Sequence, residues 1–150
     1  MSMDIKGLPE TSLNMGVLDL LEDHLHFSYS VRSSVGSRKD ELLSRLDLIV
    51  KLFGGTREIS GKYPAWEYAK ESKIRDICFS AYKDMTGEDA IITATHGGLE
   101  CGLLIDKMPG LDAISFGPDL RDVHSVREKL NIKSTVRMYE LVLRILKKCK

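Results

Sequence analysis

The stretch TATHGGLECGLLIDKMPGLDAISFGP, from Thr93 to Pro118, contains the features that decide the predicted fold. The short apolar run DAIITAT, residues 89–95, leads into this stretch, and two glycines at positions 97 and 98 end the run. A second apolar run, LDAISFG, follows the helix-like segment LECGLLIDKM. Short apolar runs that alternate with helices are typical of parallel strands buried on both faces of an α/β layer.

Two further helices are predicted around this stretch, because apolar side chains recur there every three or four residues. The first ends at Gly87 and buries a face made by Ile74, Ile77, Cys78, Ala81 and Met85. The second, with Ser134 as its N-cap, buries Met138, Leu141, Val142 and Ile145. The C-terminal half of the chain therefore alternates helix and strand.

The N-terminal half has a different, antiparallel pattern. Between Thr11 and Ser34, apolar and polar side chains alternate, as in LHFSYSVRSS, which predicts a hairpin with one buried and one wet face. A helix should follow, capped by Ser37 and ended by Gly54-Gly55. The segment TREISGKYPAW then predicts a third strand.

The predicted class is therefore α/β (α+β): strand, strand, helix and strand, followed by a small α/β layer. We place the boundary between Pro64 and Glu67, which gives domains 1–64 and 65–150. A parallel sheet of two strands leaves both edges open, so another polypeptide should cover them. A second copy of the chain, as a homodimer or a swapped oligomer, is the expected cover.

The composition excludes several classes of protein. Lys+Arg and Asp+Glu both number 22, so nothing favours nucleic acid or an anionic membrane as a partner. No apolar run is long enough to span a membrane, and the start MSMDIKGLPE lacks the core of a signal peptide. The three cysteines are too widely spaced for a disulfide framework. We expect a cytoplasmic protein.

The glycine turn is the first candidate site. His96, Gly97, Gly98 and Glu100 lie where a strand would end and a helix begin, and ligands of α/β sheets bind at that edge. The turn would bind an anion or a substrate, with Glu100 holding a cationic group. An ordinary strand-to-helix connection, in which Glu100 favours the helix N-terminus, explains the same residues.

Other candidates also have two interpretations. His124 is either a solvated loop residue or a metal ligand or base. Arg32 either grips a carboxylate or solvates an exposed strand face. His24 and His26 have a spacing that suits a metal but lie at a hairpin tip. Cys101 could act as a nucleophile paired with His96, but nothing in the sequence is seen to orient that imidazole.

From His96 to Ile132, the segments HGGLECGLL and MPGLDAISFGPDLRDVHSVREKLNI resemble the C-terminal end of the bacterial Xaa-His dipeptidases. These enzymes, also called aminoacyl-histidine dipeptidases, peptidase D or cytosol non-specific dipeptidases, belong to the co-catalytic zinc peptidases. ETSLNMGVL and SVRSSVGSRKDEL resemble the second half of the family's lid domain. The resemblance extends from about Glu10 onward.

The resemblance implies that residues 1–64 are the second half of a lid and dimerisation domain, and that residues 65–150 are the C-terminal part of the catalytic domain. His124 would be one zinc ligand of a two-zinc site, Arg32 would bind the carboxylate of a dipeptide, and the turn with Glu100 would line the substrate pocket. The family's other ligands and its general base lie in a portion that is absent here.

One departure concerns the histidine loop. The family usually continues its ligand histidine with Ser-Pro and an acid, whereas Val126 and Arg127 occupy these places here. We expect a fragment of a zinc-dependent dipeptidase that is inactive by itself, because most metal ligands are missing. The alternative is a non-catalytic dimerisation or interaction module derived from such a peptidase.

Overall fold

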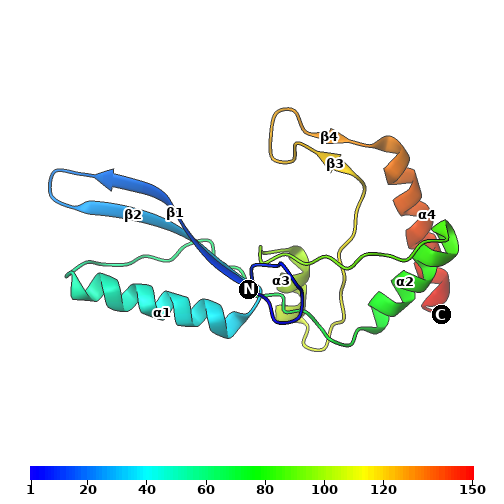
Figure 1. The fold of residues 1–150 in the computed structure, drawn as a ribbon, viewed down its shortest axis with the longest axis horizontal. Coiled ribbons are helices and arrows are strands. Elements are labelled where there is room, and N and C mark those ends of the chain that lie inside the picture. The colour runs from blue at the N-terminus through cyan, green and yellow to red at the C-terminus, as the bar shows by residue number, and fades with distance from the viewer. The chain divides into compact units, whose positions relative to one another are not determined.

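A computed structural model describes residues 1–150 (Figure 1). The elements are β1 (Thr11–Leu20), β2 (Leu25–Ser33), α1 (Gly36–Leu52), α2 (Lys73–Thr86), α3 (Glu100–Lys107), β3 (Leu120–Arg121), β4 (Lys129–Leu130) and α4 (Ile132–Lys148). Both sheets have two antiparallel strands, β1–β2 and β3–β4. The mixed α+β class predicted from the sequence is confirmed.

The chain forms two compact units, which we describe separately. Unit 1 comprises Met1–Ala69 and Thr93–Leu111, and unit 2 comprises Lys70–Ile92 and Asp112–Lys150. The first contains the β1–β2 hairpin, α1 and α3, and the second contains α2, β3, β4 and α4. The assignment of residues 1–64 to a lid and 65–150 to a catalytic domain stays a prediction.

The predicted hairpin is confirmed, with a register that the sequence did not predict. Leu20 pairs with Leu25 at the tip and Thr11 pairs with Ser33 at the base, and Gly16 is an unpaired bulge between Met15 and Val17. Because of this extra residue, the apolar side chains of β1 stay on one face on both sides of the bulge. That face contains Leu13, Met15, Leu18 and Leu20 from β1 and Leu25, Phe27, Tyr29 and Val31 from β2.

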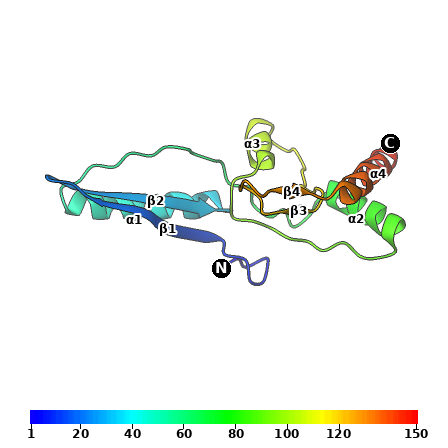
Figure 2. The same ribbon diagram turned by 90° about the horizontal axis from the view of Figure 1, so that it is seen from above.

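Helix α1 covers the apolar face of the hairpin only in part. It runs alongside β2 in both views and contacts that strand (Figures 1 and 2). Leu25 and Phe27 nevertheless remain 55% and 45% exposed. The expected division into one buried and one wet face is therefore wrong in degree, because α1 packs chiefly against β2 and leaves apolar side chains of both strands exposed.

The ends of α1 are set by backbone groups. The predicted cap at Ser37 is wrong: Val35 is the N-cap and has no capping side chain. Instead, the N–H of Gly36 donates to Oε1 of Glu67 at 3.1 Å, so a remote carboxylate satisfies one free donor of the first turn. The helix ends as predicted, because Gly54 has φ +68° and the N–H of Gly55 donates to the carbonyl of Val50.

Three predicted strands are not formed. Residues 56–66, 89–95 and 111–117 have no regular secondary structure, and neither sheet contains a parallel pair. A strand needs hydrogen-bonded neighbours, and the chain offers none to these segments. Ile91 and Phe116 accordingly remain 87% and 46% exposed. A strand over 56–66 would also include Pro64, which has no N–H to donate.

Helices α2 and α4 pack together and form the core of unit 2 (Figures 1 and 2). Cys78 and Ala81 from α2 meet Leu141 and Ile145 from α4, and all four are buried. Burial raises the pKa of the Cys78 thiol, and the neighbouring Cys149 and Asp112 add to this effect. The faces predicted from helical spacing are therefore confirmed, except for Val142, which is 38% exposed and lies outside this core.

The N-caps of these helices are built from side chains. At α2, Ser72 accepts a hydrogen bond from the N–H of Arg75, and Gly87 adopts φ +79° at the C-cap. At α4, the predicted Ser134 cap is wrong by three residues, because Asn131 is the N-cap. Ser134 lies buried inside the first turn, where its hydroxyl accepts from the N–H of Asp119 at 2.9 Å.

Candidate functional site

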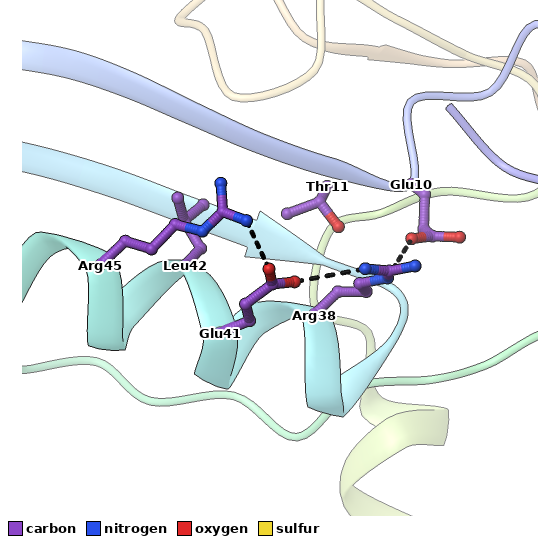
Figure 3. A pocket seen from close by; sticks show the side chains of 6 residues that line it. All are labelled: Glu10, Thr11, Arg38, Glu41, Leu42 and Arg45. Atoms are coloured by element: carbon purple, nitrogen blue, oxygen red, sulfur yellow. Dashed lines mark hydrogen bonds and ion pairs between the residues drawn. The ribbon is translucent and has the colours of Figure 1, made fainter.

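The two faces of the hairpin base have different neighbours. Thr11 points toward α1, because it lines an open pocket with Arg38, Glu41, Leu42 and Arg45 of that helix and with Glu10 (Figure 3). Successive side chains on a strand point to opposite faces. Ser12 therefore lies on the other face, together with Arg32, which is its direct partner on β2.

The charged residues that line the pocket beside α1 form ion pairs with one another. Arg45 Nη2 and Arg38 Nη1 lie 2.5 Å and 3.2 Å from the carboxylate oxygens of Glu41, and Arg38 Nε lies 3.9 Å from Oε1 of Glu10 (Figure 3). The hydrogen bonds from Arg45 and Arg38 hold the pKa of Glu41 below its usual value. The charges are thus paired internally, and we assign this cluster to fixing α1 on the hairpin base.

On the opposite face, the structure brings His96 to the partner of Arg32. The Nε2 atom of His96 lies 2.9 Å from Oγ of Ser12, across 84 residues of sequence, and the contact is partly buried. Opposite residues in an antiparallel pair have Cβ atoms about 4.5–5.5 Å apart, so His96 and Arg32 flank the same serine. Two of the predicted substrate-binding residues are therefore neighbours.

Arg32 is available to a ligand. Its side chain is exposed and makes no hydrogen bond or ion pair within the chain. Asn14 and Ser30 form the next cross-strand pair on the same face, so polar groups continue beside the guanidinium. A free guanidinium with polar neighbours is suited to hold a carboxylate with two parallel hydrogen bonds.

The glycine turn is shaped by close packing within unit 1. A Cβ on Gly98 would lie 2.6 Å from Cδ1 of Tyr63, and a Cβ on Gly102 would meet the carbonyl of Pro64 and the side chain of Trp66 at 3.4 Å. Neither Gly97 nor Gly98 has a positive φ. The close neighbour that requires a glycine at position 98 is thus the Tyr63 ring, whereas the sequence predicted a ligand in that place. A ligand at this turn stays a prediction.

Glu100 occupies the first turn of α3 and is exposed. A carboxylate there interacts favourably with the helix dipole, which is one of its two predicted roles. Its exposure leaves the carboxylate accessible to a cationic group, so the substrate role stays a prediction. Helix α3 has no side-chain cap, because its N-cap residue is Leu99.

His124 lies in unit 2, in the loop between β3 and β4. Its N–H donates to Oε2 of Glu128 at 2.9 Å, and the hydroxyl of Ser125 donates to the carbonyl of Asp122 at 2.7 Å. His124 and Asp122 both have positive φ, at +64° and +51°, which is uncommon for residues other than glycine. The imidazole is exposed and accepts no hydrogen bond.

The residues of this chain do not fit a zinc site by themselves. No group of three His, Cys, Asp or Glu side chains is placed to hold a metal ion. His24 and His26 at the hairpin tip lie 2.6 Å and 3.4 Å from carboxylate oxygens of Asp23 and Asp19, as separate pairs. Tight zinc sites use three or four protein ligands, and His124 would supply one.

The sequence analysis missed Ser12 and Tyr63. Counting back from the four-residue connection at 21–24 places Arg32 opposite Leu13, and only the bulge at Gly16 shifts its partner to Ser12. A glycine inside a strand pattern is a signal for such a bulge. Tyr63 lies in a segment without regular secondary structure, so no periodic signal marks it.

The chain resembles known proteins in both sequence and structure. No family model matches the chain. The cytosol non-specific dipeptidase of Escherichia coli (strain K12) is 34% identical over 142 residues, which cover 95% of this chain and 29% of that protein. The crystal structure of an aminoacylhistidine dipeptidase from Vibrio alginolyticus superposes with a TM-score of 0.86 and 32% identity, over 99% of this chain and 30% of that one.

The chain thus spans less than a third of the length of both relatives. None of its four helices has the length and hydrophobicity that a membrane span requires. The relationship predicted from the HGGLECG and lid-like segments is confirmed by both comparisons. Over nearly its whole length, the chain is homologous to a segment of the cytosol non-specific, or aminoacylhistidine, dipeptidases.

Proposed function

We propose that the chain provides the substrate-recognition part of a zinc-dependent dipeptidase that acts in the cytoplasm on Xaa-His and other dipeptides. The homology to two dipeptidases over 95% and 99% of the chain supports this proposal. The single structural observation that carries it is that Ser12 contacts His96 and is also the cross-strand partner of the unpaired Arg32.

Each proposed site residue has a separate role. Arg32 binds the C-terminal carboxylate of the dipeptide, and His96, Gly97 and Gly98 line the pocket beside it. Glu100 lies near the amino group of the substrate, which is cationic at neutral pH. His124 contributes one ligand to a two-zinc site whose other ligands, together with the general base, lie outside this chain.

The chain alone is proposed to be inactive. The lack of a three-ligand group within it means that zinc binds weakly at best. The experiment is an assay of Xaa-His hydrolysis by the purified 150-residue chain with added zinc, for which we expect no turnover. Turnover that disappears in His124→Ala would contradict the proposed inactivity.

The role of Arg32 is testable without turnover. Arg32→Ala should weaken the binding of an Xaa-His dipeptide by about 10- to 100-fold, because a hydrogen bond to a charged group contributes about 1.5–3 kcal/mol. Calorimetry or NMR titration measures the change. Arg38→Ala is the matched control, because Arg38 is engaged with Glu10 and Glu41. Equal affinity in Arg32→Ala and the unaltered chain removes Arg32 from the site.

The second candidate is a non-catalytic dimerisation or interaction module. Exposed apolar side chains at the C-terminal end of α1 favour it, since Leu52 and the C-cap residue Phe53 are 82% and 87% exposed. A homodimer or swapped oligomer would cover them. Sedimentation equilibrium decides whether the chain self-associates, and a monomer that binds the dipeptide favours the first proposal over the second.

A further inference from the structure

We infer that Ser12 is a positioning residue: its hydroxyl fixes the His96 imidazole against the hairpin base, so that His96 and Arg32 address the same carboxylate. The inference rests on the proposed function for its substrate. It adds a residue that neither the sequence pattern nor the family resemblance singled out, and it gives the Ser12–His96 contact a role beyond packing.

The contact links two parts of unit 1 that are far apart in sequence. Ser12 Oγ and His96 Nε2 are 2.9 Å apart, and both residues are only partly exposed. The hydroxyl on the neighbouring strand position is used differently, because Thr11 Oγ1 lies 2.9 Å from Ser33 Oγ on the side of α1. Of the two adjacent hydroxyls, Ser12 is therefore the one on the face with Arg32.

The chemistry of the ring explains why a serine suits this place. A carboxylate accepts hydrogen bonds, so each group that binds it must donate one. If the Ser12 hydroxyl donates to Nε2, the neutral imidazole carries its proton on Nδ1. The Nδ1 atom itself makes no hydrogen bond in the structure. His96 then offers an Nδ1–H donor on the face where Arg32 offers its guanidinium.

The test begins with the ring nitrogens of His96 in the ¹⁵N-labelled 150-residue chain. NMR should show the Nδ1–H tautomer in the unaltered chain and a mixture of tautomers in Ser12→Ala. Ser12→Thr, which keeps the hydroxyl, should restore the original signals. Thr11→Val removes the neighbouring hydroxyl and should leave the His96 signals unchanged. A His96 tautomer that does not respond to Ser12→Ala, or an Nε2–H tautomer in the unaltered chain, overturns the inference.

A titration with glycyl-histidine separates this inference from the proposed function. We expect Ser12→Ala to weaken binding about fivefold, which corresponds to one hydrogen bond, and Ser12→Thr to restore it. Unchanged affinity in Ser12→Ala, with an altered His96 signal, also overturns the positioning role. Arg32 signals that do not move at saturating dipeptide contradict the proposed function instead, while the tautomer measurement still decides whether Ser12 orients His96.

Discussion

The helix pair of unit 2 and the two apolar runs at 89–95 and 111–117 were all predicted from apolar side chains, yet only the helices form. Helices α2 and α4 satisfy most of their backbone groups internally and bury Ala81 and Leu141 mainly against each other, with Ile114 packed against the same core. The two runs need neighbouring strands for their backbone groups, and the chain supplies none. We call the helix pair the self-sufficient part and the two runs the dependent part, because the runs have no strand partner within the chain.

The largest effect should come from the self-sufficient part. Leu141→Ala removes a side chain that is 5% exposed in the α2–α4 core, and such a change costs about 2–5 kcal/mol of unfolding free energy. Urea unfolding followed by circular dichroism measures the loss. Leu143→Ala, on the same helix but 42% exposed, should cost much less. Equal losses in the two variants would show that the core of unit 2 is not where we place it.

A smaller effect is expected at the glycine turn, which depends on packing from a distant segment. Gly98→Ala places a Cβ 2.6 Å from the Tyr63 ring, and overpacking of this kind costs about 1–3 kcal/mol. Gly97→Ala is the matched control, since its nearest contact is Thr95 Oγ1 at 3.4 Å. Thermal unfolding compares the two variants, and addition of Tyr63→Ala to Gly98→Ala should recover part of the loss. No recovery would mean that Tyr63 does not occupy this space.

The start of α2 gives a pH-dependent effect. Hydrogen bonds from the N–H of Ile74 and the hydroxyl of Ser72 lower the pKa of Asp112 from its ordinary value of 3.8. Its stabilisation is therefore complete above about pH 3.8 and is lost as the pH falls through the lowered pKa of the folded state.

Asp112→Asn should consequently cost about 0.5–1 kcal/mol at pH 7, because the exposed carboxylate is screened by solvent, and should cost little at pH 2. Urea unfolding at both pH values measures the difference. Glu71→Gln removes a nearby exposed carboxylate without a hydrogen bond or ion pair, and should change neither value. A loss at Asp112 that is equally large at pH 2 refutes the role of its charge.

The smallest effect should come from the dependent part. Ile91 is 87% exposed, so Ile91→Ala should change the unfolding free energy of the chain by less than about 0.5 kcal/mol. The same urea experiment compares it with Leu141→Ala. If Ile91→Ala destabilises the chain comparably, residues 89–95 are packed within it, and the distinction between the two parts fails.

The predictions from sequence succeeded where the signal is local. Helical spacing identified the inner faces of α2 and α4, and alternation identified the hairpin. The caps at Ser37 and Ser134 were wrong, because Glu67 and Asn131 satisfy the first turns instead. Glu67 lies 31 residues from Gly36, so only the folded chain brings it there, whereas Asn131 is a local cap of a residue type that commonly begins helices.

The candidate site could likewise be predicted only in part from the sequence. Family resemblance selected Arg32 and His96, and the structure brings them to one serine. Ser12 itself was not predictable from simple counting, because the bulge at Gly16 changes its partner from the one that a regular ladder would give. The role of His124 as a metal ligand and that of the glycine turn as part of the substrate pocket remain predictions.

Gly16 also has a consequence for how this hairpin tolerates changes in length. Deletion of this single residue would leave an uninterrupted ladder in which Ser12 still opposes Arg32 and Leu18 still opposes Phe27. Loss of this residue would therefore make the ladder regular without altering the pairing at the base or at the tip. An evolving sequence can lose or regain the bulge here while the guanidinium and its serine keep their alignment.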